Sequence, residues 1–167
     1  NTGTSDGRTG ATGIALLTYF GAGYTYADGP RAPAIRKGLN FLLQSMNVNS
    51  AGYGDFKGGD TGHGGIYQHG LAAAAVCEAL AVNRVLVRMV RSDRSVKFID
   101  PSGKAVTLSD LTKLGNVLRN ASQLAINYIV YHQDAKAGGW GYTPKSAGDT
   151  SILGWQVMAL ISARSEK

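Results

Sequence analysis

Two kinds of apolar segment alternate along the chain. In residues 35–46 and 111–128, apolar side chains recur three or four positions apart, which predicts amphipathic helices with one buried face. Residues 71–82 and 152–161 are apolar at nearly every position, and each contains a single polar side chain. A helix that is apolar on every side must be covered on every side. We therefore predict an all-α fold in two layers, with amphipathic outer helices covering apolar inner helices.

The outer segments repeat with a constant spacing. Residues 36–42 align with residues 123–129 at an offset of 87 residues (123 − 36 = 87). The same offset aligns the glycine-rich residues 52–54 with residues 139–141. An offset shared by the helix and the loop that follows it indicates one structural unit that occurs twice.

The inner segments also repeat, but at a different offset. An alignment over 80 residues (149 − 69 = 80) places His69 and Asp149 at the same repeat position, at the start of an inner helix. Residues 11–17 look like an earlier copy of this segment. The order along the chain is therefore inner, outer, inner, outer, inner, or about two and a half helical hairpins. Repeated hairpins of this kind stack into a solenoid or close into a ring.

An insert at residues 85–108 lengthens the second hairpin. Residues 87–91 and 95–99 have strand composition and residues 100–103 favour a turn, which predicts a small β-hairpin or a three-stranded meander. Much of the positive charge lies in or beside this insert, on Arg84, Arg88, Arg91, Arg94, Lys97 and Lys104. Phe98 is its one aromatic side chain, so nucleic acid is not an expected partner, whereas contact with an anionic membrane surface stays open. The simplest interpretation is a solvated hairpin whose arginines protect its edge.

A loop motif in the second half resembles a known family. Residues 125–129, followed by Gln133, Gly138 and Trp140, resemble the QW motif of squalene cyclases. Residues 148–160 resemble the start of an inner helix in the prenyltransferase and squalene oxidase repeat family. The resemblance covers most of the chain apart from the insert. It implies an α/α toroid, a ring of helical hairpins around an apolar cavity, of which this chain would form a partial ring.

The chemistry of that family requires groups that the chain supplies only in part. Squalene cyclases protonate their substrate with the middle aspartate of an Asp-x-Asp-Asp run, and here Asp149 matches only the last one, with Gly148 at the donor position. Prenyltransferases hold zinc with an Asp-x-Cys pair and a histidine, and here Ser151 replaces the cysteine. His69 and Asp149 are the remaining catalytic candidates, although Asp149 would serve equally well as a helix cap.

Four further residues are candidates for lining a ligand cavity. Tyr67, Trp140 and Trp155 could contact a polyprenyl chain or stabilise a carbocation, or they could stack between helices and stiffen the repeat. Glu78 is the single carboxylate on an apolar helix, which suits either a buried acid or a gap that faces solvent.

The glycine-rich loop before the second inner helix carries groups that can bind metals. Asp60, His63 and His69 could converge on a metal ion if the loop folded around it. Polar decoration of a loop is the simpler interpretation, so we expect neither a metal nor another cofactor.

Composition limits the remaining alternatives. With 167 residues and 44% apolar content, the chain has the size of one domain, so we treat residues 1–167 as a single repeat domain. Cys77 is the only cysteine, which excludes an internal disulfide. The 23 glycines are about twice the ordinary share and suit tight turns in the loops.

The incomplete ring and the incomplete catalytic set together suggest a function. A partial ring leaves apolar inner faces uncovered, so we expect the chain to belong to a longer protein or to self-associate. We interpret it as a scaffold that binds an apolar ligand, such as an isoprenoid, or another protein. The alternative is an isoprenoid cyclase or transferase whose catalytic acid or metal site lies outside this chain.

Overall fold

The computed structural model describes residues 7–60, 62–100 and 102–164. Over these residues the chain is mostly helical, which confirms the all-α class. The helices are α1 (Arg8–Gly21), α2 (Ala32–Ser45), α3 (Gly64–Ser92), α4 (Leu108–His132) and α5 (Thr150–Arg164). The strands are β1 (Asn47–Val48), β2 (Gly54–Asp55), β3 (Phe98–Ile99) and β4 (Ala105–Val106). They form two short antiparallel pairs, β1 with β2 and β3 with β4.

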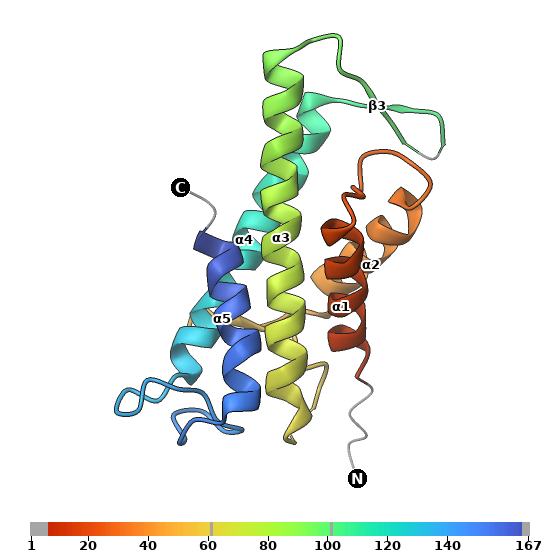
Figure 1. The fold of residues 1–167 in the computed structure, drawn as a ribbon. Coiled ribbons are helices and arrows are strands. Elements are labelled where there is room, and N and C mark those ends of the chain that lie inside the picture. Colours follow the sequence, from red (N-terminus) through yellow and green to blue (C-terminus); the bar gives the residue numbers. More distant parts are fainter. Residues whose placement is uncertain (1–6, 61, 101, 165–167) are drawn as a thin grey trace.

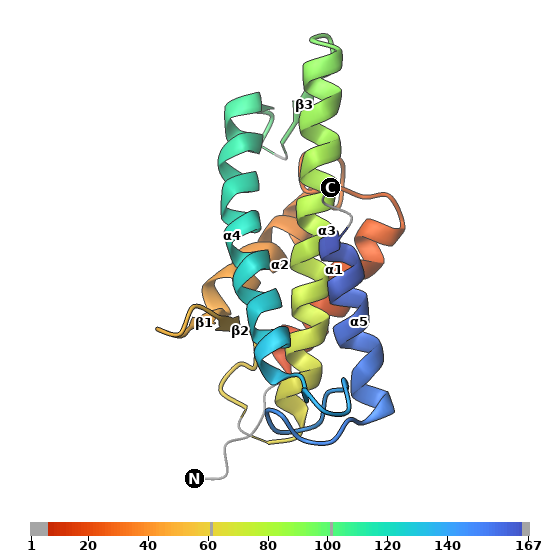
Figure 2. The same ribbon diagram turned by 90° about the vertical axis from the view of Figure 1, so that its left-hand side faces the viewer.

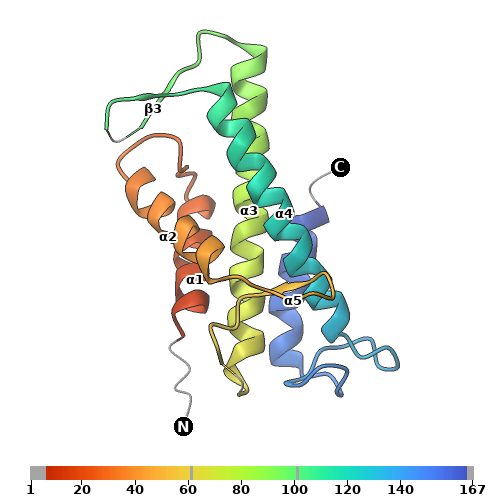
Figure 3. The same cartoon turned by 180° about the vertical axis from the view of Figure 1, so that it is seen from behind.

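The helices lie in two layers. Helices α1, α3 and α5 stand side by side with α3 in the middle, and α2 and α4 lie behind them (Figures 1 and 3). Seen from the side, α4 stands apart from α3 and α5, which overlap in this view (Figure 2). We call α1, α3 and α5 the inner layer and α2 and α4 the outer layer, which is the alternation that the sequence predicts.

Helix α3 is the core of the molecule. From Gly65 to Leu80 almost every residue is buried, because α1, α4 and α5 all pack against this segment. Small residues permit the close approach: a Cβ on Gly13 of α1 would lie 2.7 Å from the Leu71 carbonyl group. Among the described residues, α3 is the one helix long and apolar enough to cross a membrane, but 67% of its most apolar window is buried in the protein, as expected for a core helix.

Helix α5 is equally apolar but is covered on one side only. Its buried residues are Ile152, Gln156, Ala159 and Ser162, which form one stripe against α3. The opposite stripe is exposed and apolar, and we call it the α5 stripe: Leu153, Met158 and Ile161, the last with 61% of its surface accessible. Within the described residues, α5 therefore lacks the cover on every side that α3 has between Gly65 and Leu80, and its outer face is an apolar inner-layer surface left uncovered.

One register of 87 residues relates the two hairpins. Helices α2 and α4 end at Ser45 and His132 (132 − 45 = 87). The buried positions of the inner helices keep the same spacing (156 − 69 = 87). The matching buried residues are His69, Ala72 and Ala75 in α3 and Gln156, Ala159 and Ser162 in α5.

The alignment of His69 with Asp149 is therefore wrong. Asp149 directly precedes α5, whereas His69 is the sixth residue of α3. The two alignments differ by seven residues (87 − 80), close to two turns of about 3.6 residues each. A shift of two turns leaves each residue on the same face of the helix, so apolar periodicity fits both alignments.

The insert contains a shorter hairpin than expected. Residues 87–91 are not a strand, because α3 continues through Ser92. Asn83, Leu86 and Val90 all face the protein, and their spacing of three and four residues is that of a helix. The hairpin is confirmed only at β3 and β4, where Phe98 pairs with Val106.

The hairpin is held against the outer layer. The Arg36 guanidinium of α2 lies 3.3 Å from the Asp100 carboxylate and donates through Nε to the Tyr26 carbonyl at 2.6 Å. Hydrogen bonds from Ser102 and Lys104, together with Arg36, lower the pKa of Asp100 to about 2. The Asp100 carboxylate is thus ionised over the physiological range and ties the insert to α2.

Candidate functional site

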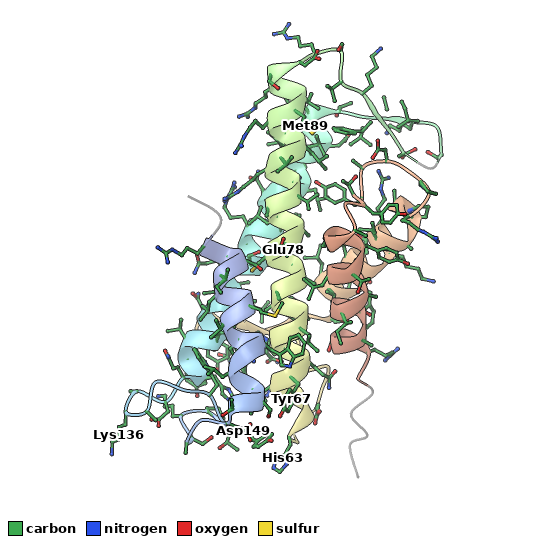
Figure 4. The ribbon with its side chains drawn as sticks, viewed as in Figure 1. His63, Tyr67, Glu78, Met89, Lys136 and Asp149 are labelled. Carbon is green, nitrogen blue, oxygen red and sulfur yellow. The ribbon has the colours of Figure 1, made fainter. Side chains whose placement is uncertain are left out.

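A hydrogen-bonded cluster of polar side chains lies at one end of the inner layer. The Tyr67 hydroxyl of α3 is 2.5 Å from Ser151 Oγ of α5 and 3.3 Å from the Tyr142 hydroxyl. The Ser151 hydroxyl donates in turn to the Asp149 carboxylate at 2.5 Å. The His63 ring packs against Tyr142 with 4.5 Å between centroids. Figure 4 shows His63, Tyr67 and Asp149 together where α3 and α5 begin.

The charges in this cluster are set by its hydrogen bonds. The Ser151 hydroxyl and backbone N–H hold the pKa of Asp149 below its usual value. Hydrogen bonds with Tyr67 and Asp149 raise the pKa of Tyr142 to about 12. Near neutral pH the cluster therefore contains an ionised carboxylate and protonated hydroxyl groups. It can orient a polar group, but it offers no strong acid for protonating an alkene.

Asp149 acts as the cap of α5. Its carboxylate accepts the Ser151 N–H at 2.8 Å, and its backbone carbonyl accepts the Ile152 N–H at 3.1 Å. Both contacts satisfy donors that the first turn of a helix leaves free.

His69 lies in the core, away from the polar cluster. Its Nδ1 accepts the Phe56 N–H and its Nε2–H donates to the Ala125 carbonyl, each at 3.2 Å. Burial lowers its pKa to about 3, so the ring is neutral at physiological pH. His69 thus connects α3 to α4 and to the loop after β2, and the structure does not bring it together with Asp149.

The three possible metal ligands occupy separate environments. Asp60 accepts hydrogen bonds from the Gln68 amide at 3.2 Å and the Gly62 N–H at 2.7 Å. His63 is the N-cap of α3, and His69 is in the core. Within the described residues, no group of three histidine, cysteine or carboxylate side chains gathers as a metal site would require.

The remaining cavity candidates contact neighbouring helices. The buried Trp140 indole donates to the Ile129 carbonyl of α4 at 2.8 Å. Half-buried Trp155 packs at Gly70 of α3, where an added Cβ would lie 2.9 Å from the tryptophan Cβ. Half-buried Glu78 accepts the Ser162 hydroxyl of α5 at 2.7 Å. These contacts link the repeat units.

The sequence predicts an uncovered apolar inner face but does not single out the residues of the α5 stripe. The sequence of α5 resembles that of α3 in composition, so no local signal separates a covered apolar helix from an uncovered one. On α1, at the other edge of the inner layer, Ile14 is also exposed. The edges of the inner layer therefore present apolar surface that the described residues leave uncovered.

Comparison with known proteins adds no relative: no family model, no curated protein and no solved structure matches the chain. The resemblance to squalene cyclases therefore rests on the motif residues themselves. In the structure the Gln133 amide donates to the Gly138 carbonyl at 2.7 Å, and Trp140 is bonded to α4. Both residues fasten the loop to the end of the outer helix.

Proposed function

We propose that the chain is a helical-repeat scaffold of the squalene cyclase and prenyltransferase type, and that it binds an apolar partner through its inner layer. One observation carries this proposal, the α5 stripe of Leu153, Met158 and Ile161, which is apolar and exposed. Contiguous apolar surface is costly to leave in water, and in folded proteins it marks interaction sites.

The form of the stripe favours a helix as the partner. Met158 and Ile161 of the stripe, together with the exposed Gly154 beside them, are spaced four and three residues apart, as in a ridge that packs against another helix. An added Cβ on Gly154 would meet no atom within 4 Å, so a partner backbone can come close. The partner that fits is another apolar helix face, supplied by a second copy of this chain or by further hairpins of a longer protein.

The polar candidates support binding rather than catalysis. His69 is neutral and makes both of its hydrogen bonds inside the core. Asp149 is held ionised as a helix cap. Glu78 is bonded to Ser162 between two inner helices. Each of these groups has a structural role that accounts for its position.

The experiment compares two apolar surfaces of the same chain. Light scattering and apolar-dye fluorescence are measured for the wild type, for Leu153→Ser/Met158→Ser/Ile161→Ser, and for Val117→Ser/Val130→Ser. The two valines are exposed on α4 and provide the control. We expect association and dye binding in the wild type and the α4 variant, and a loss of both in the α5 variant. A monomeric wild type that binds no dye would contradict the proposal, as would an equal loss in both variants.

The alternative function is an isoprenoid cyclase or transferase completed by residues outside this chain. The polar cluster favours it, because Ser151 lies two turns from Met158 on the same side of α5. Asp149, Tyr142 and Ser151 could there orient the polar end of an apolar substrate. Native mass spectrometry with a polyprenyl diphosphate and zinc separates the two functions. Stoichiometric zinc, or ligand binding lost in Asp149→Asn, would favour the enzyme.

A further inference from the structure

The extension of α3 through Ser92 moves much of the positive charge from a hairpin onto a helix. Arg84, Arg88 and Arg91 are spaced four and three residues apart, so they lie along one side of α3. At 1.5 Å per residue, the row they form is about 10 Å long. This part of α3 extends beyond α1 and α5 (Figure 1).

A groove of about 1010 Å³ runs between this part of α3 and α4. The three arginines line it on the α3 side, and Thr112, Asn116 and Arg119 line it on the α4 side. Arg119 Nη1 donates to Asn116 Oδ1 at 3.1 Å, so the fourth guanidinium is anchored at the wall. Four arginines from two helices therefore surround one concave surface, which is more than a solvated helix face provides.

No acidic side chain lines this groove among the described residues. On either side of the arginine row, Glu78 accepts the Ser162 hydroxyl and Asp93 accepts the Ser95 N–H. Positive charge gathered in a concave surface with apolar walls concentrates anions there. The planar guanidinium forms paired hydrogen bonds with phosphate oxygens, which an ammonium group does not.

We propose that the α3–α4 groove binds the phosphate groups of a polyphosphorylated ligand. The row of arginines suits several linked phosphates better than a single one, because successive guanidinium groups lie about one helical turn apart. The phosphates can belong to a free ligand or to the headgroups of an anionic membrane, and exposed Val85 and Met89 flank the row. Among the described residues, no aromatic side chain on which bases could stack lines the groove, which disfavours single-stranded nucleic acid. This proposal is independent of the apolar partner, since it uses no residue of the α5 stripe.

Binding of inorganic tripolyphosphate, measured by calorimetry at low and physiological salt, tests the groove. The variant is Arg88→Gln/Arg91→Gln, and the control is Lys37→Gln/Lys136→Gln, which removes the same charge elsewhere. Lys136 lies at the opposite end of the molecule from Met89, which marks the arginine row (Figure 4). We expect saturable binding to the wild type and the control, and affinity about tenfold or more weaker in the arginine variant. Circular dichroism and melting temperature verify that each variant is folded.

Three results would overturn the proposal. They are absence of saturable tripolyphosphate binding, an equal loss in the two variants, and tighter binding of a single-stranded oligonucleotide that survives loss of the arginines. A vesicle assay identifies the source of the phosphate. If vesicles that contain a polyphosphorylated phosphoinositide bind through the arginines and tripolyphosphate competes, the ligand is a membrane headgroup. If tripolyphosphate alone binds, the ligand is free in solution.

Discussion

Helices α3 and α5 are related by the register of 87 residues, yet they have different surroundings. Both are apolar on nearly every side, but α3 is covered by α1, α4 and α5, whereas α5 buries only the stripe that faces α3. An apolar sequence therefore predicts that a helix face will be covered but does not say what covers it. No described residue covers the α5 stripe, and the proposed function is argued from this exposed surface.

The equivalent buried positions also differ in how well they are satisfied. His69 of α3 uses both ring nitrogens, one to Phe56 and one to Ala125. Its counterpart in α5, Gln156, donates to the Ile66 carbonyl at 3.1 Å, and its Oε1 has no hydrogen-bond partner among the described residues. Thus His69, in the covered helix α3, makes a hydrogen bond through each ring nitrogen, whereas Gln156 in α5 leaves its oxygen without a hydrogen bond among the described residues.

The largest contrast is expected between the two sides of α5. Ile152→Ala removes a fully buried side chain and should lower the free energy of unfolding by about 2–4 kcal/mol. Ile161→Ala removes an exposed one and should change it by no more than about 0.5 kcal/mol in the dilute monomer. Urea denaturation measures both. Comparable losses would show that α5 is covered on both sides.

Acid should destabilise the protein through the core of α3. The pKa of His69 is near 3 in the folded state and near 6.5 when unfolded, so the unfolded chain takes up the proton first. Stability should fall as pH drops below 6.5, by about 1.4 kcal/mol per pH unit, until the folded pKa is reached. The loss between pH 6.5 and 5 is therefore about 2 kcal/mol.

His69→Gln isolates this contribution. Glutamine can accept from Phe56 and donate to Ala125 as histidine does, but it does not titrate. Denaturation at pH 7 and pH 5 should show a smaller loss in the variant than in the wild type. The remaining slope includes His132, whose pKa is also lowered by burial. An identical pH dependence in both proteins would exclude a neutral, buried His69.

Glycines on the two helices should respond to alanine in opposite directions. In Gly70→Ala, the new Cβ on α3 would meet the side chains of Trp155 and Gln156, so a loss of about 1–2 kcal/mol is expected. In Gly154→Ala, the new methyl on α5 meets open space and helix propensity improves, so a gain of about 0.5–1 kcal/mol is expected. The melting temperature should fall in Gly70→Ala and rise in Gly154→Ala. A change in the same direction in both variants would contradict a packed surface at Gly70 and an open one at Gly154.

The smallest contrast lies at the two helix starts. Asp149 caps α5 with its side chain, whereas His63 at the start of α3 makes no side-chain cap hydrogen bond. Asp149→Ala should therefore lower the melting temperature slightly, and His63→Ala should have less effect. Amide hydrogen exchange in the first turn of α5 would locate the change. Faster exchange in the first turn of α3 instead would contradict the assignment of the cap.

The sequence predicts the helices that apolar periodicity defines, and it does not predict features that depend on how distant segments pack together. The amphipathic spacing in residues 35–46 and 111–128 identified both outer helices, and the apolar run in residues 71–82 identified the core helix. The composition of residues 87–91 predicts a strand but is also compatible with a helix, and packing of Leu86 and Val90 against the protein favours the helix.

The candidate site was predicted in the same uneven way. Tyr67 and Asp149 are candidates for different roles in the sequence, and their meeting in one polar cluster is a finding of the structure. The sequence places His69 at the start of a helix because a seven-residue shift preserves the helical face. The groove beside Arg119 could not be found from sequence, because it depends on how two helices from different units approach each other.

Oxidation of two methionines tests the central claim most directly. Met158 in the α5 stripe and Met89 near the end of α3 are similarly exposed, at 44% and 43%. In the dilute chain, hydrogen peroxide should oxidise both at comparable rates, as peptide mass spectrometry can measure. At concentrations where the chain associates, or with an apolar partner, Met158 should become protected several-fold and Met89 should not. Resistance of Met158 in the dilute monomer, or equal protection of both residues, would contradict an uncovered inner face that binds an apolar partner.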